Sequence, residues 1–263
     1  MSRVGTLILR AGPWLVPVAL VLAWEAAADS GLLAARVLPA PSATVLAAWD
    51  LLRSGELGRS ILISTERAFL GLAIGGVLGL ALGLLTGAWP AAERLLDSTL
   101  QMLRNVPHLA IIPLVILWFG IGEEAKLFLV ALGVFFPIYA NTLHGIRSVD
   151  PGLVEMGRVY GMSRTALFTR VVLPGALPSI FVGLRYALGI MWLTLIVAET
   201  ISASSGIGYM TMNAREFLQT DVVLLGIIVY ALLGKLADVL TRWIEHRALA
   251  WHPSYQPQTG AAA

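Results

Sequence analysis

The chain has 263 residues, of which 57% are hydrophobic and 13% are charged. Globular proteins have roughly 45–50% apolar and about 25% charged residues, so this composition, with a mean hydropathy of +0.80, excludes an ordinary soluble monomer and indicates a membrane protein. The formal net charge of +2 is too small to favour nucleic acid as a partner. The absence of cysteine excludes disulfides, thiolate metal sites and cysteine nucleophiles.

The beginning of the sequence superficially resembles a secretory signal peptide. Arg3 and Arg10 precede an apolar stretch that ends in the small residues 26–28. Glu25 adjoins the supposed cleavage site, and hydrophobic segments continue along the whole chain. We therefore expect an uncleaved first transmembrane span.

Six stretches are long and apolar enough to cross a bilayer, which requires about 20 residues each. They are residues 14–33, 68–89, 102–119, 125–143, 179–201 and 222–239. The expected fold is therefore all-α, a polytopic membrane protein with six transmembrane helices in one domain over residues 1–263. Six crossings place both termini on the same side of the membrane.

Charges in the loops predict which side that is. Residues 120–124 carry no Lys or Arg, whereas residues 147–170 hold four arginines. Positively charged short loops stay in the cytoplasm, so both termini are expected there.

The second expected span carries glycine at every fourth position. These residues are Gly71, Gly75, Gly79, Gly83 and Gly87. Small residues at this spacing let another helix approach closely. A step of four overshoots a helical turn by about 40°, so we expect the stripe to pack against more than one neighbour.

The polar loop 147–178 is predicted to be structured. Asp150 followed by Pro151 indicates a helix start, and Gly161 is suited to the residue just beyond the helix end. Ser163 is expected to cap a second helix that runs to Val172 and ends at Pro174. A DNA-reading helix pair is disfavoured, because both ends of the loop are held at the membrane.

The same loop resembles the cytoplasmic signature of permease subunits of bacterial ABC importers, E-A-A-x3-G-x9-I-x-L-P. The matching positions are Glu155, Met156, Gly157, Gly161, Val171, Leu173 and Pro174. The spacing is complete, although Met156 and Gly157 replace the alanines and Val171 replaces isoleucine. The resemblance covers residues 104–248 and is greatest to the nitrate, taurine and aliphatic sulfonate importer family, within it to aliphatic sulfonate permeases.

This resemblance implies an ABC importer type I-like permease fold and a set of partners. The seven signature positions would couple the chain to two ATP-binding cassette subunits. A second copy of the permease, an extracytoplasmic binding protein and membrane lipid complete the expected partners, in the bacterial inner membrane. No cofactor is expected on this chain, because it lacks the G-x-x-x-x-G-K-[ST] motif that cradles ATP; the partner subunit would use ATP.

Three residues spaced by seven on the fifth expected span are candidates for the substrate path: Arg185, Trp192 and Glu199. Charged residues within a span normally face protein or water. A guanidinium such as that of Arg185 suits the three oxygens of a sulfonate. Glu199 would repel an anion and is interpreted as a structural or gating residue.

Other functions remain as alternatives. Catalysis is disfavoured, because the four histidines lack paired metal-ligand spacing and no G-x-S-x-G motif occurs. Taurine, nitrate or another small molecule could replace the sulfonate. An ion-coupled secondary carrier and a structural scaffold are further alternatives, but neither would explain the function of the structured 147–178 loop.

Overall fold

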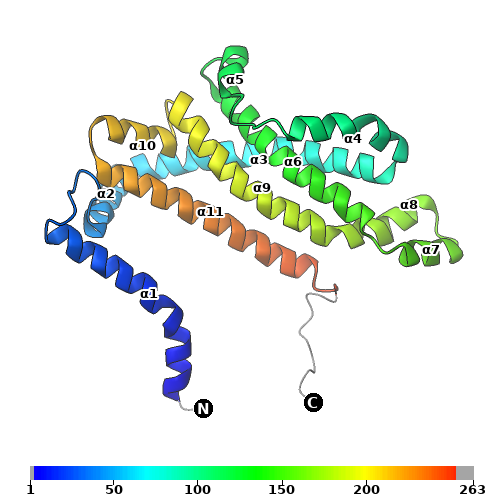
Figure 1. The fold of residues 1–263 in the computed structure, drawn as a ribbon, viewed down its shortest axis with the longest axis horizontal. Helices are drawn as coiled ribbons and strands as arrows, with labels where there is room; N and C mark the ends of the chain where they lie inside the picture. Colours follow the sequence, from blue (N-terminus) through cyan, green and yellow to red (C-terminus); the bar gives the residue numbers. More distant parts are fainter. Residues whose placement is uncertain (1–2, 253–263) are drawn as a thin grey trace. The chain divides into compact units, whose positions relative to one another are not determined.

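The computed structural model describes residues 3–252, which form helices joined by turns and contain no strand (Figure 1). In chain order the elements are α1 (Arg3–Asp29), α2 (Pro41–Arg53), α3 (Glu56–Ala88), α4 (Pro90–Arg104), α5 (Ile112–Phe119), α6 (Glu123–Arg147), α7 (Pro151–Val159), α8 (Arg164–Leu167), the π-helical turn η1 (Phe168–Val172), α9 (Leu173–Ser202), α10 (Ile207–Glu216) and α11 (Thr220–Ala248). The predicted all-α class is confirmed.

Four helical segments among the described residues are long and apolar enough to cross a membrane. They are Glu56–Ala88, Glu123–Arg147, Arg164–Ile201 and Thr220–Ala248. Each covers one of the expected spans, except that Trp89 lies just beyond the first segment. Helix α1 covers most of the expected first span but is not among these four.

The third expected span, 102–119, is wrong as a single helix. Helix α4 ends at Arg104, and α5 begins only at Ile112. Pro107 explains the break, because proline lacks an amide donor and disfavours helical geometry at the residue before it. Helix α5 has eight residues, about 12 Å at 1.5 Å per residue, and is too short to cross the membrane alone.

The described residues form two compact units. One comprises the chain up to residue 63 together with residues 204–230, and the other comprises residues 64–203 and those from 231 onwards. In the first unit, the Ser42 amide and hydroxyl donate to the Glu25 carboxylate at 3.0 and 2.5 Å. The hydroxyl of Thr220 donates to the carbonyl of Ala35 at 2.9 Å, which joins α11 to the turn after α1.

Helices α6 and α9 lie side by side and antiparallel in the second unit (Figure 1). A Cβ added at Gly133 would lie 3.0 Å from the Thr194 hydroxyl, whereas one at Gly145 would lie 2.8 Å from the Ala176 carbonyl. Glycine thus brings the two backbones together at both ends of the contact.

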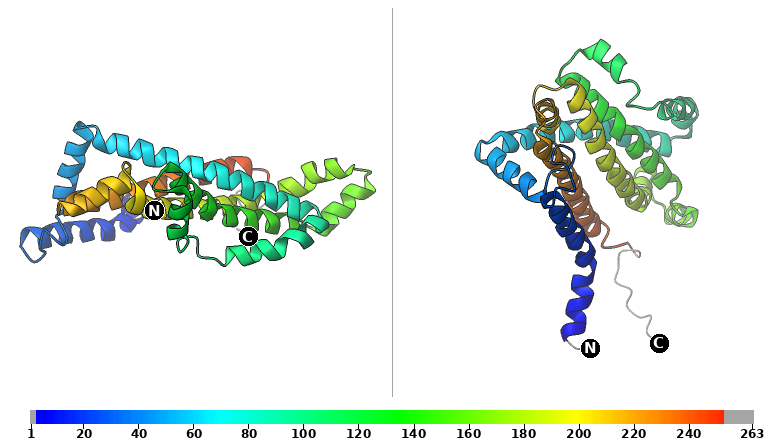
Figure 2. Two further views of the ribbon diagram at one scale, coloured as in Figure 1. Left: turned by 90° about the horizontal axis from the view of Figure 1, so that it is seen from above. Right: turned by 60° about the vertical axis from the view of Figure 1, so that its left-hand side comes forward.

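Helix α3 runs parallel to α6, and the glycine stripe forms the contact (Figure 2). The contacts advance in register along both helices, from Gly71 against Val130 to Gly87 against Ile146. A Cβ at Gly75 would lie only 2.0 Å from the Ala131 carbonyl oxygen. The nearest atoms to all five glycines belong to α6, and contact of the stripe with a further neighbour stays a prediction. The two helices stay together by winding around each other, which offsets the drift of the stripe.

The second helix of the 147–178 loop does not end at Pro174. Helix α8 passes through the π-helical turn η1 directly into α9, which contains both Pro174 and Pro178. A proline ring clashes with the carbonyl four residues earlier. A π turn widens the helix locally, and it lies immediately before Pro174, where this clash would otherwise occur.

Candidate functional site

Helix α7 is fixed at both ends by local hydrogen bonds. The Asp150 carboxylate accepts the Gly152 amide at 2.8 Å, with Pro151 in the first turn. At the other end, the amides of Gly161 and Met162 donate to the carbonyls of Arg158 and Gly157. This is the Schellman arrangement, and Gly161 adopts the positive φ of 73° that it requires. The predicted caps at Asp150, Ser163 and Gly161 are confirmed.

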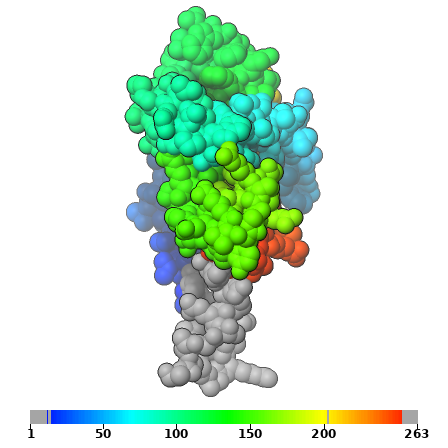
Figure 3. Space-filling view, turned by 90° about the vertical axis from the view of Figure 1, so that its right-hand side faces the viewer, coloured from blue at the N-terminus to red at the C-terminus, as the bar shows by residue number. Residues whose placement is uncertain are grey.

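The outer face of α7 is apolar and exposed. Leu153 and Met156 are 47% and 50% exposed, and Val159 and Tyr160 are each 81% exposed. Figure 3 shows the tip formed by α7 and α8 from its free end (yellow-green). Glu155 lies beside this face, in a shallow depression that it lines with Val154 and Arg158. Such a short, rigid helix can transmit motion that a flexible loop would absorb.

The signature positions divide into two groups in the structure. Glu155 and Met156 are exposed, whereas Gly157 is buried. A Cβ at Gly157 would lie 2.6 Å from Leu167 Cδ1, so glycine permits α7 to pack on α8. Gly161 is exposed at the turn after α7, and Val171, Leu173 and Pro174 are half-buried at the junction of η1 and α9.

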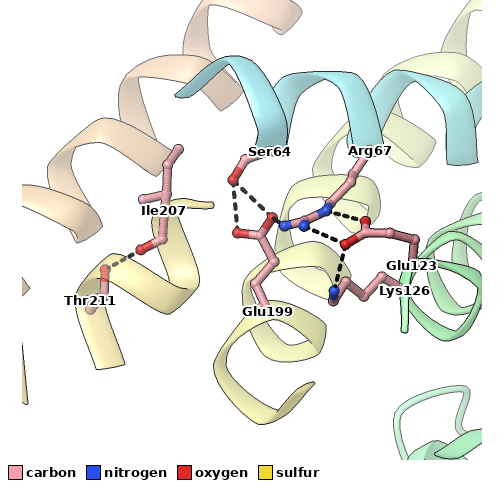
Figure 4. Close-up of polar contacts among 7 residues, drawn as sticks. All are labelled: Ser64, Arg67, Glu123, Lys126, Glu199, Ile207 and Thr211. Carbon is pink, nitrogen blue, oxygen red and sulfur yellow. Dashed lines mark hydrogen bonds and ion pairs between the residues drawn. The ribbon is translucent and has the colours of Figure 1, made fainter. Parts of the chain in front are cut away.

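A second cluster consists of charged side chains that join α3, α6 and α9 (Figure 4). The Arg67 guanidinium donates to Glu199 through Nη1 at 2.7 Å, and to Glu123 through Nε and Nη2 at 2.5 and 2.6 Å. Ser64 donates to the Glu199 carboxylate at 2.8 Å, and Lys126 Nζ to Glu123 at 2.9 Å. Two cations and two carboxylates therefore form one network.

Most of this network is removed from solvent. Arg67, Lys126 and Glu199 are only 4%, 2% and 1% exposed, whereas the Glu123 side chain is 53% exposed. Isolated charges in a low-dielectric interior cost several kcal/mol each, so the mutual pairing makes their burial possible. The network can hold three helices in a fixed arrangement.

Sequence reasoning found only Glu199 of this cluster. A helical spacing of three between Glu123 and Lys126 was the available signal. The pairing of Arg67 with Glu199 joins residues 132 positions apart, and no local pattern reveals it.

The three residues proposed for the substrate path do not meet in one place. Arg185 Nε lies 3.7 Å from Asp238 Oδ1, and its Nη1 lies 3.6 Å from Glu245 Oε2, both on α11. Trp192 is buried, and a Cβ at Gly234 would lie 3.7 Å from it. Glu199 belongs to the charged network. Arg185 and Glu199 are 14 residues apart on α9, about 21 Å along the helix axis.

A family comparison assigns the chain to the inner-membrane components of transport systems. The chain matches the family described as "Binding-protein-dependent transport system inner membrane component" over residues 68–249, and it belongs to this family.

Two curated relatives carry the same name. The chain is 63% identical over 248 residues to the "Putative aliphatic sulfonates transport permease protein SsuC" of Escherichia coli (strain K12), with 94% of each chain covered. It is 48% identical to the protein of that name from Bacillus subtilis (strain 168), covering 92% of this chain and 88% of the relative.

A solved structure supports the fold. The chain is similar to one from "an amino acid ABC transporter with histidines", with a TM-score of 0.61, 18% identity and coverage of 78% of this chain and 97% of the other. At this identity the likeness concerns the fold alone.

Proposed function

We propose that the chain is the permease subunit of an ATP-driven importer that moves aliphatic sulfonates across the bacterial inner membrane. The observation that carries this proposal is helix α7, which is capped at both ends and presents Leu153, Met156 and Tyr160 to solvent. An exposed apolar face on a rigid tip is suited to docking on another protein. The names of the two sulfonate permease relatives support the substrate class.

The direction of α3 and α6 supports six crossings. Because these two helices run parallel, the chain between them must return across the membrane. The segment α4–α5 makes that return as a broken crossing, and α1 makes the first of the six. Both termini then lie in the cytoplasm with α7, in agreement with the four arginines of residues 147–170.

This arrangement suits the partners that the family resemblance implies. Two ATPase subunits dock beneath α7 of two permease copies, and an extracytoplasmic binding protein delivers substrate from above. Glu155 supplies a polar contact beside the apolar face of α7. ATP is bound and hydrolysed by the ATPase subunits, and closure of these subunits moves α7.

The movement of α7 has a direct route to the membrane helices. Helix α7 packs on α8, which continues through η1 into α9. The charged network links the far end of α9 to α3 and α6 through Arg67. These helices therefore move as one body between inward-open and outward-open states.

Reconstitution of the permease with its ATPase and binding protein in proteoliposomes tests the function. The expected result is uptake of a radiolabelled alkanesulfonate that requires ATP and all three components. Uptake driven by an ion gradient without ATP would overturn the proposal in favour of a secondary carrier. Equal or better uptake of taurine or nitrate would retain the importer class and replace the substrate.

A further inference from the structure

A cavity of about 400 Å³ lies between the α4–α5 break, α6 and α9. Its polar lining comprises Arg104, His108, Asn141 and Tyr186, and its apolar lining includes Phe136 and Ile190. Ligand sites of small molecules are typically about 300–1,000 Å³ and combine an apolar wall with a few polar groups. This cavity has that character.

The cavity lies beside the middle of α6, one of the helices expected to cross the membrane. Its α6 lining extends from Leu132 to Asn141, in the central part of the helix Glu123–Arg147. The non-helical backbone between Arg104 and Ile112 borders the same space. Irregular backbone at membrane depth is tolerated only where it is buried in protein or lines a water-filled cavity, and broken helices form the substrate sites of many transporters.

The charge of the cavity is positive. None of the described residues that line it is acidic, and Arg104 makes no ion pair with another described residue. Arg67 and Arg185, by contrast, each face two carboxylates. A charged group at membrane depth costs about 2.5–3.5 kcal/mol on insertion scales and usually marks a functional path.

Two of the other polar groups, His108 and Asn141, are held in place by the protein. His108 Nε2 lies 3.0 Å from the Thr194 hydroxyl, which orients the ring. Asn141 Nδ2 donates to the Pro137 carbonyl at 2.8 Å, which fixes the amide. The Tyr186 side chain is 66% exposed and can turn its hydroxyl to a ligand.

We propose that this cavity holds the substrate during transit, with Arg104 binding the anionic head group and Phe136 and Ile190 flanking its alkyl chain. A guanidinium offers several donors in a fixed plane to the three oxygens of a sulfonate. Arg104 therefore takes the role that Arg185, paired with Asp238 and Glu245, does not fill. This assignment rests on the proposed function.

Direct binding to the purified permease–ATPase complex, without the binding protein, tests the site. The probe is a radiolabelled alkanesulfonate measured by equilibrium dialysis. Arg104→Gln should weaken binding about tenfold, as expected for loss of a charge-assisted hydrogen bond. The matched control is Arg94→Gln, which removes an exposed arginine of α4 that does not line the cavity. Equal binding by the two variants, or no binding by the unmodified complex, would overturn the assignment.

Uptake by the reconstituted three-component importer distinguishes this assignment from the function itself. Arg104→Gln should lower uptake about tenfold while the loaded binding protein still stimulates ATP hydrolysis. Equal loss of hydrolysis and uptake would indicate a structural role and overturn the assignment. Absence of ATP-dependent uptake in the unmodified importer would instead overturn the proposed function.

A cavity-filling variant gives a second readout. Ala140 lines the cavity, so Ala140→Phe should exclude long-chain alkanesulfonates more strongly than methanesulfonate. A uniform effect on all chain lengths would contradict the placement of the alkyl group.

Discussion

Arg67 on α3 and Glu199 on α9 form an ion pair in which Nη1 lies 2.7 Å from Oε1, with both side chains almost completely buried. Ser64, one turn before Arg67, adds a hydrogen bond to the same carboxylate. Glu123 binds the other side of the guanidinium. The pair therefore connects the helices that line the core of the larger unit, at the end of α9 opposite α7.

Removal of one partner of this pair should destabilise the protein strongly. Arg67→Met leaves Glu199 buried without its main counter-charge, and such changes cost about 3–5 kcal/mol. Thermal unfolding of the purified permease in detergent measures the effect. Arg59→Met, which removes an exposed arginine from the same helix, is the matched control.

The double variant Arg67→Met/Glu199→Leu sharpens this test. Its loss of stability should be smaller than the sum of the two single losses, because no buried charge of the pair remains. Additive losses would show that the two side chains do not depend on each other.

The glycine contact between α3 and α6 predicts a selective effect of added methyl groups. Gly75→Ala places a Cβ 2.0 Å from a backbone oxygen of α6, so the helices must separate, at a cost of about 1–3 kcal/mol. The control is Gly58→Ala, a substitution on the same helix whose added Cβ would have no atom within 4 Å. That control should be neutral or stabilising by up to about 1 kcal/mol. Equal melting temperatures for both variants would contradict the tight contact.

Local features of the molecule could be predicted from the sequence. Asp150, Ser163 and Gly161 act on backbone groups within three residues of themselves, so their residue types identify the helix ends. Long apolar runs likewise identify α3, α6, α9 and α11, because a helix satisfies its own backbone in the membrane.

Features that depend on distant residues could not be predicted in the same way. The π turn before Pro174 and the winding of α3 around α6 both depend on how neighbouring turns pack. Arg67 on α3 binds Glu123 on α6 and Glu199 on α9, so the network joins three helices. Hydropathy alone also fails at Pro107, where a continuous apolar stretch conceals a break in the helix.

Gly161 tests whether the shape of the loop matters for coupling. A Cβ at this position would meet nothing within 4 Å, so a substitution acts only through the positive φ of 73°. A left-handed conformation costs an L-residue roughly 1–2 kcal/mol, and a β-branched residue tolerates it least. Gly161→Val should therefore leave membrane insertion intact and reduce ATP-dependent uptake about tenfold or more.

Gly161→Asn is the control for this change, because asparagine adopts the left-handed region more readily. It should retain most of the uptake of the unmodified permease. Normal ATP-dependent uptake by the valine variant would count heavily against the role of this loop in coupling.

The exposed apolar face of α7 predicts where the ATPase binds. Met156 is 50% exposed, and Met156→Asp would bury an unpaired carboxylate in the proposed interface, at a cost of several kcal/mol. The permease should then insert and fold normally but lose its ATPase during co-purification. Thr165→Asp adds the same charge to an exposed position on the adjacent helix α8 and should leave association intact. If both variants retain the ATPase equally, the carboxylate introduced at Met156 is not buried against the ATPase. The docking surface then lies elsewhere than on the α7 face.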